Sequence, residues 1–190
     1  MKVSRARAEE NRNRIVEVAG RLFREHGFDG IGIADLMKAA GLTHGGFYGN
    51  FKSKEDLAAQ ACAKALGQNR DGWARTAESG HAEPYGDLVR SYLSERHRDA
   101  RGTGCVLAAL APDAARHGAE VRAAFTAGVR SYVEILSKLV PGRSKEAKRK
   151  AATARLAEMV GALVLARAVD DPELSASILE SALADLVPAR

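Results

Sequence analysis

The sequence predicts an all-α fold, and three observations lead to that prediction. Alanine, the residue with the highest helix propensity, occurs 36 times among the 190 residues. Valine, isoleucine and threonine, which favour strands, occur only 23 times together. Apolar residues recur at helical spacing along most of the chain, and no segment makes a credible strand. We therefore expect about nine helices and no sheet.

The first expected helix ends near Gly27, because glycine readily adopts the left-handed conformation that closes a helix. Several arginines fall outside its apolar stripe and are expected to face water or a partner. The stripe has the i, i+3, i+4, i+7, i+8 spacing of one buried face and consists of Ile15, Val18, Ala19, Leu22 and Phe23.

Two short helices are expected next, over residues 33–40 and 43–50, with Gly41 in the turn between them. A tight turn between helices needs a positive φ, which glycine adopts without strain. Thr43 is expected to cap the second helix. This order is typical of a helix-turn-helix, whose second helix lies in the major groove of DNA, although spacing alone is a weak signal.

The rest of the chain predicts six further helices separated by glycine and proline. Ser53 is expected to cap a long helix that runs to about Trp73. Gly80 with Pro84, and then Gly102-Thr103-Gly104, mark the next two breaks. The helices that follow are expected over about 88–93, 105–110, 119–140, 144–169 and 172–186.

The segment GFDGIGIADLMKAAGLTHGGFYGNFKSKEDL resembles the DNA-binding domain of TetR-family transcriptional repressors, over about Arg12 to Leu57. The resemblance implies a homodimer with a DNA-binding domain over residues 1–54 and a ligand-binding and dimerisation domain over 55–190. Gly104-Cys105-Val106-Leu107-Ala108-Ala109-Leu110 is similar to a segment in one branch of these regulators. The matching motif pieces are Gly27-Phe28, Ala40-Gly41-Leu42, Gly46-Phe47-Tyr48, Phe51 and Ser53-Lys54-Glu55.

Within this resemblance, roles follow from position. Thr43 and the free amides at the start of the recognition helix can bind a phosphate, and His44 can reach a base edge. Gly45 and Gly46 would let the backbone approach DNA closely, at a cost of about 1 kcal/mol each relative to alanine. Tyr48 and Lys54 match the family's phosphate-contacting positions, whereas Phe47 and Phe51 are expected in the core. The expected DNA-binding residues are Arg5 and Arg7 of an N-terminal arm, Thr43, His44, Gly45, Gly46, Tyr48, Asn50 and Lys54.

Three positions depart from the family pattern, namely Gly32, Gly49 and Asn50. Glycine is still an acceptable cap at position 32, where threonine or serine is usual. Gly49 replaces a larger, often polar residue, and Asn50 replaces a histidine or another aromatic residue. The recognition helix is therefore poor in side chains that read bases, and Thr43 with His44 is expected to carry most direct readout.

The second domain is expected to hold a small-molecule effector, because such pockets are mostly apolar with a few polar groups. Its most apolar helices suit a four-helix interface between two subunits. The expected ligand-binding residues are Trp73, Tyr92, His97, Cys105, Phe125, Tyr132 and Met159. The expected dimer-interface residues are Met159, Val160, Leu163, Val164, Leu174, Ile178, Leu179 and Leu183.

Cys105 offers an alternative way of switching, since a thiol at a helix start is activated by the helix dipole. The alternative function is therefore a repressor that senses oxidants or electrophiles through Cys105, whereas a buried cysteine without chemistry is the commoner case. Cys62 is expected in the core. The basic cluster Arg143, Lys145, Lys148, Arg149 and Lys150 is interpreted as a solvated helix start rather than a second DNA site.

Composition excludes several other classes. The net charge is +5, of which residues 1–54 carry +4. No apolar stretch is long enough for a membrane span or a signal peptide, and two cysteines do not make a disulfide framework, so we expect a cytoplasmic protein without a membrane partner. The five histidines lack metal-ligand spacing and no nucleophile motif or phosphate loop occurs, so no enzyme, metal or cofactor is expected.

A helical protein-interaction module without DNA binding is a third class, against which the arrangement of residues 43–54 argues. The favoured function is a regulator, most simply a repressor, that a small-molecule effector releases from a palindromic operator in double-stranded DNA.

Overall fold

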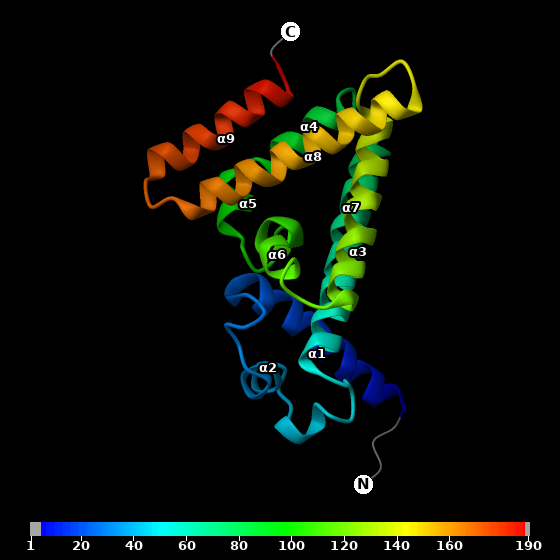
Figure 1. Cartoon of the computed structure of the whole chain (residues 1–190), viewed down its shortest axis with the longest axis vertical. Helices are drawn as coiled ribbons and strands as arrows, with labels where there is room; N and C mark the ends of the chain where they lie inside the picture. Colours follow the sequence, from blue (N-terminus) through cyan, green and yellow to red (C-terminus); the bar gives the residue numbers. More distant parts are fainter. Residues whose placement is uncertain (1–4, 189–190) are drawn as a thin grey trace.

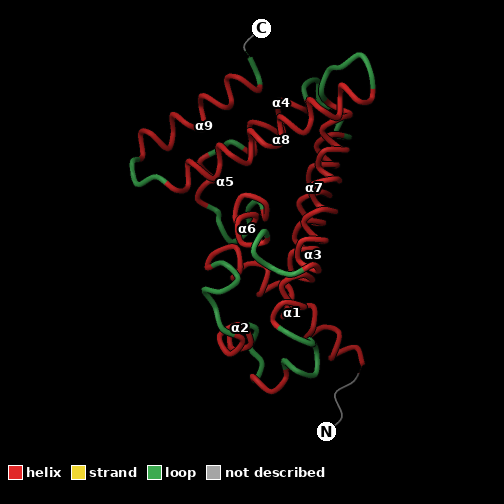
Figure 2. The backbone as a smooth tube through the Cα atoms, in the orientation of Figure 1, coloured by secondary structure: helices red, strands yellow, loops and turns green. Residues whose placement is uncertain are grey.

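A computed structural model describes residues 5–188 of the chain. In this range the chain forms nine α-helices and one 3₁₀ turn and no strand (Figures 1 and 2), which confirms the all-α prediction. The elements are α1 (Arg5–His26), α2 (Ile33–Ala39), η1 (His44–Gly46), α3 (Lys54–Ala77), α4 (Pro84–Tyr92), α5 (Glu95–Asp99), α6 (Val106–Ala114), α7 (Ala119–Leu139), α8 (Lys145–Ala168) and α9 (Pro172–Leu186).

The helices form two groups that α3 connects (Figure 1). Helices α1 and α2 with η1 lie at one end of the molecule, and α8 with α9 lies at the other. Helix α3 packs against α1 in its first half and runs beside α7 along its length, while α6 lies between α1 and α8. Within the described residues, no helix combines the length and apolar character that crossing a lipid bilayer requires.

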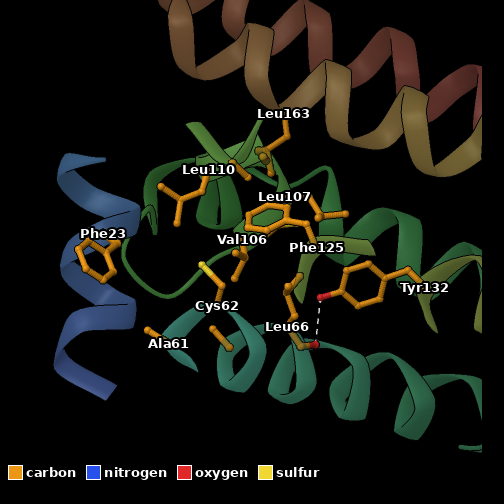
Figure 3. Packing of buried hydrophobic residues seen from close by; sticks show 14 of the residues in the cluster. Phe23, Ala61, Cys62, Leu66, Val106, Leu107, Leu110, Phe125, Tyr132 and Leu163 are labelled. Carbon is orange, nitrogen blue, oxygen red and sulfur yellow. Dashed lines mark hydrogen bonds between the residues drawn. The ribbon is translucent and has the colours of Figure 1, made fainter. Parts of the chain in front are cut away.

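One continuous core fills both groups. Phe23 of α1 lies toward Ala61 and Cys62 of α3, and α6 covers this contact with apolar side chains (Figure 3). Farther along, the buried Tyr132 hydroxyl of α7 donates a hydrogen bond of 3.2 Å to the Leu66 carbonyl of α3. Because a buried polar group without a partner is costly, this bond fixes the register of α7 on α3.

The helix ends follow the predicted signals where glycine or serine is present. Gly27 has φ of 77° and its amide donates to the Phe23 carbonyl at 2.8 Å, which closes α1. After α2, Gly41 has φ of 70°, and the Gly41 and Leu42 amides donate to the carbonyls of Lys38 and Met37. This paired arrangement is a Schellman motif, and it sets the direction in which the chain leaves α2.

The predicted helix over 43–50 is wrong in form. The structure has a single 3₁₀ turn, η1, followed by hydrogen-bonded turns to Asn50. Thr43 occupies the N-cap position, but its side chain makes no capping hydrogen bond. Three glycines within residues 45–49 explain the difference, because each lowers helix stability by about 1 kcal/mol relative to alanine. We call residues 43–50 the recognition segment.

Two further elements differ from the sequence prediction. Helix α5 was not expected, because its sequence ERHRD has no apolar periodicity; the Ser94 hydroxyl accepts the His97 amide at 3.2 Å and starts it. Helix α1 begins at Arg5, so the expected N-terminal arm is helical at Arg5 and Arg7. The expected count of nine helices therefore agrees with the structure only because the short third helix was counted and α5 was missed.

We predict that Gly41→Ala lowers the free energy of unfolding by about 1–2 kcal/mol, because an alanine must then adopt a left-handed conformation. Urea unfolding measures this loss. Gly45→Ala is the matched control: no atom lies within 4 Å of the added methyl and the φ of Gly45 is not positive. An equal loss in both variants would contradict the role of Gly41.

Candidate nucleic-acid interface and ligand cavity

The recognition segment presents two rings to the solvent. Tyr48 is 66% exposed, and His44 is also exposed. The Tyr48 ring meets the His44 ring edge-on at a centroid distance of 5.9 Å and the Phe47 ring at 5.3 Å. Since Phe47 is fully buried, it holds the outer two rings at a fixed place on the surface.

The backbone of the recognition segment is held by its own hydrogen bonds. The Asn50 side-chain amide donates to the Gly46 carbonyl at 2.7 Å, and the Phe51 amide donates to the Phe47 carbonyl at 3.0 Å. Asn50 therefore stabilises the turn from within. Gly45 faces open space, whereas a methyl on Gly46 would lie 3.5 Å from the Met37 side chain. Gly45 and Gly49 are both exposed, so backbone without a side chain is accessible at these two positions.

Lys54 stands at the start of α3, directly after the recognition segment. The Ser53 hydroxyl accepts the Asp56 amide at 3.0 Å, which confirms the predicted cap, and the Asp56 carboxylate accepts the Lys52 amide at 2.9 Å. That backbone hydrogen bond lowers the pKa of Asp56. The half-buried Lys54 is therefore placed by a rigid helix start.

Arg12 ties α1 to this helix start. Its guanidinium donates a hydrogen bond to Gln60 of α3 and lies over the Phe51 ring, 5.2 Å from the centroid. Arg5 and Arg7 are exposed on the first turns of α1. Their predicted contacts with DNA would therefore come from a helix end instead of an extended arm.

A cavity of about 490 Å³ lies among α3, α4, α5, α7 and the loop before α6. Five of the seven predicted ligand residues line it: Trp73, Tyr92, His97, Cys105 and Tyr132. Phe125 and Met159 do not, and their prediction as lining residues is corrected. Both are buried in the core, because helical periodicity marks a buried face without separating a cavity wall from packed interior.

The sequence prediction did not include several polar residues that line the cavity, among them Asn69, Thr76 and Arg96. Asn69, Trp73 and Thr76 follow one another at i, i+4 and i+7 on α3, a spacing that could have identified the stripe. Arg96 lies on the unexpected α5 and gave no signal. The other lining residues are Leu88, Ser91, Ala100, Thr103 and Gly104.

Aromatic rings form one wall of the cavity. The Trp73 ring is stacked on Tyr132, with centroids 4.8 Å apart and planes at 34°, and it meets Tyr92 edge-on at 5.8 Å. Tyr92 is 4% exposed, and its hydroxyl has no hydrogen-bond partner among the described residues. Burial raises the pKa of Tyr92, so this hydroxyl stays protonated and remains a donor.

His97 connects the cavity to the start of α6. Its Nε2 accepts the Cys105 amide at 2.9 Å, so the proton resides on Nδ1, which donates to the Tyr92 carbonyl at 2.7 Å. Both ring nitrogens are therefore used internally in the neutral form. Burial lowers the pKa of His97, which is consistent with that form.

The loop before α6, which lines the cavity with Thr103 and Gly104, also contacts α1. Arg24 of α1 donates from Nε to the Gly102 carbonyl at 2.7 Å, one residue before the cavity residue Thr103. On the other side, Glu55 near the start of α3 accepts the Gly118 amide at 2.7 Å, at the N-terminus of α7. Two hydrogen bonds thus join α1 and the start of α3 to the loops on either side of α6.

The predicted dimer residues divide between surface and core. Leu174 is 48% exposed, and the unpredicted Leu165 of α8 is 58% exposed. Val160, Val164, Ile178 and Leu183 are half-buried. Met159, Leu163 and Leu179 are buried within the subunit, so their predicted contact with a second subunit stays a prediction.

Comparison with known proteins gives a family match over the DNA-binding end. Residues 15–61 match the model described as "Bacterial regulatory proteins, tetR family". The HTH-type transcriptional regulator TtgR of Pseudomonas putida is 35% identical over 98 residues, which are 50% of this chain and 46% of TtgR. The HTH-type transcriptional repressor NemR of Escherichia coli is 24% identical over 132 residues, covering 67% and 66% of the two chains. The chain spans less than half the length of several curated relatives that it matches.

Solved structures match over nearly the whole chain. The reduced form of Escherichia coli NemR has a TM-score of 0.78 at 22% identity and covers 94% of this chain and 95% of its own. AibR, solved with isovaleryl coenzyme A and operator DNA, has a TM-score of 0.67 at 17% identity and covers 95% and 100%. At these identities the likeness establishes the fold.

We predict that acid destabilises the protein through His97. Above its ordinary pKa of 6.5, the side chain is neutral both folded and unfolded, and the contribution to stability is complete. Below 6.5 the unfolded chain binds a proton that the folded chain excludes, so the free energy of unfolding falls until the lower folded pKa is reached.

Urea unfolding at about pH 7.5 and about pH 5.5 measures the effect. His97→Asn is expected to show a smaller difference between the two pH values than the wild type. The exposed control, His44→Asn, keeps the wild-type difference. An unchanged difference in His97→Asn would refute the assignment.

Proposed function

Because the chain belongs to the TetR family of bacterial transcriptional regulators, we propose that it represses transcription by binding a palindromic operator as a homodimer and that a small-molecule effector releases it. The observation that carries the proposal is the exposed His44–Tyr48 ring pair beside the open Gly45 backbone. Packing within the chain does not explain this pair, because both rings are exposed to solvent. The family match covers the same segment.

The roles of the DNA-binding residues follow from accessibility. Thr43 and the amides of η1 meet a phosphate, and His44 contacts a base edge. Tyr48 and Lys54 hold the neighbouring phosphates, and Gly45 lets the backbone enter the groove. Asn50 acts indirectly by keeping the turn closed through its bond to Gly46. Residues 1–54 form the DNA-binding domain, and residues 55–190 bind the effector and the second subunit.

The outer face of α8 and α9 supports dimerisation. Exposed leucines on both helices lie beside half-buried Val164 and Ile178. Burying such apolar area stabilises association, and a twofold axis presents the same surface on both subunits. Two recognition segments then face successive major grooves about 34 Å apart.

The cavity supports the proposed effector site, and the hydrogen bond between Gly102 and Arg24 of α1 supports the proposal that an effector controls DNA binding. AibR, which shares the fold, is solved with an acyl coenzyme A and operator DNA together. In this chain an effector that contacts Thr103 lies one residue from the Gly102–Arg24 hydrogen bond. An effector that favours a conformation without this bond would shift α1 and with it the recognition segment.

We predict that Tyr48→Phe weakens binding to all DNA sequences by a similar factor, about fivefold, because a neutral hydrogen bond to phosphate contributes about 1 kcal/mol. His44→Ala instead is expected to reduce the preference for the operator over a changed operator. Mobility-shift titrations on a palindrome selected from a random duplex library measure both effects. Affinity should also fall steeply with salt, since phosphate binding releases counterions.

Tyr85→Phe is the matched control, because Tyr85 lies on α4 away from the recognition segment. A flat salt dependence, or unchanged sequence preference in His44→Ala, would contradict the proposed interface. Gly45→Ala separates binding from folding, since its methyl meets only open space in the free protein. Its affinity for DNA is expected to fall without loss of stability.

A second candidate is release by an electrophile at Cys105, favoured because both thiols are buried but only that of Cys105 lines the cavity. Burial raises the pKa of Cys62 to about 12, which makes that thiol unreactive. A quinone would add to the Cys105 sulfur, with the thiol proton passing to a quinone oxygen. The new bulk would then stand at the N-terminus of α6.

We predict that benzoquinone releases the reduced protein from its operator and that Cys105→Ala abolishes the release. The measurement is a mobility shift with intact-mass analysis of the adduct. Cys62→Ala is the control and keeps the wild-type response. Retained release in Cys105→Ala would eliminate this candidate and leave reversible effector binding.

A further inference from the structure

The cavity carries one formal charge, and that charge is unpaired. Among the lining residues, Arg96 is the only arginine or lysine, and no aspartate or glutamate contributes. Arg96 forms no ion pair among the described residues. Its neighbour Arg98, in contrast, pairs with Asp99 at 2.8 Å. The open side of the cavity therefore has a cation without a counter-ion.

One buried donor without an acceptor also lines the cavity. The Tyr92 hydroxyl is buried and unpartnered. Buried donors without partners are rare in folded proteins, which indicates an acceptor that a ligand supplies.

The third feature is the aromatic wall of the cavity, which Trp73, Tyr92 and Tyr132 form. Trp73 is half-buried and lines the cavity while its ring stacks on Tyr132. A planar ring gains both apolar burial and ring contact against such a wall. His97 is excluded as a ligand-binding base, because both of its nitrogens already have partners.

We propose that the effector is an aromatic carboxylate whose ring packs on Trp73 and whose anionic group binds Arg96. This inference rests on the proposed effector site and adds its chemical class. A guanidinium binds a carboxylate through two parallel hydrogen bonds, which a neutral amide cannot reproduce. The cavity of about 490 Å³ lies within the usual range for drug-sized ligands.

The test uses the full-length protein and three matched pairs of probes: benzoate with benzamide, 2-naphthoate with 2-naphthamide, and indole-3-acetate with indole-3-acetamide. Titration calorimetry gives each affinity. For at least one pair we expect the acid to bind roughly tenfold more tightly than its amide, the factor that a charged hydrogen bond contributes. Octanoate, an anion without a ring, is expected to bind more weakly than that acid.

Two variants locate the interaction. Arg96→Gln is expected to reduce the preference for the acid to within about twofold, since the guanidinium pair is lost. Arg122→Gln, an exposed arginine on α7 outside the cavity, keeps the preference. Because Trp73 is the only tryptophan of the chain, a change in tryptophan fluorescence by benzoate reports contact with this wall directly.

If no acid binds more tightly than its amide, or if Arg96→Gln keeps the full preference, the proposal is overturned. Circular dichroism confirms that each variant is folded. A mobility shift with the same samples tests DNA binding separately. Lost DNA binding with an intact preference for the acid would refute the proposed function alone, whereas intact DNA binding without the preference would refute this inference alone.

Discussion

The close packing of α3 between α1 and α7 is the constraint on which the rest of the structure depends. Glycine makes both contacts close: a methyl on Gly20 of α1 would lie 3.6 Å from the Ala61 carbonyl, and one on Gly128 of α7 would lie 2.9 Å from Leu66. Small residues let helix axes approach, so dispersion and apolar burial are gained along the whole of α3. The Tyr132–Leu66 hydrogen bond then fixes how far the two helices slide. The recognition segment and the cavity are both positioned from this helix.

Charge is distributed according to what each end of the molecule contacts. The first 54 residues carry nearly all of the net positive charge, and the remaining 136 carry +1. Glu55 and Asp56 follow directly after this range, so the excess does not extend past Lys54 into the first turn of α3. The cavity likewise has a positive formal charge that comes from one residue, because Arg96 is the only arginine or lysine among its lining residues and no acidic residue lines it. The net charge of +5 for the whole chain reveals neither the charge of residues 1–54 nor the charge of the cavity.

Much of the fold could be predicted from the sequence because its signals are local. Gly27 and Gly41 adopt the positive φ that their positions require, and Ser53 caps α3 as its hydroxyl allows. The recognition segment could not be predicted in form, since helical propensity and three glycines compete there and tertiary packing of Phe47 decides. Arg96 and α5 escaped prediction because charged residues without periodicity give no burial signal. Met159 and Leu163 are buried within the subunit, because apolar residues of α8 face inward where neighbouring helices cover them.

Because α3 is long, a small rotation at one end of this helix produces a larger displacement at its other end. Lys54 and Trp73 stand 19 residues apart on one unbroken helix, a span of about 28 Å at the rise of an α-helix. A rotation of roughly 10° about the cavity end would therefore carry the other end through roughly 5 Å. That displacement is a large fraction of the width of a major groove, about 12 Å. Under the proposed function, a small rotation of α3 at its cavity end would thus displace the recognition segment on DNA by several ångströms.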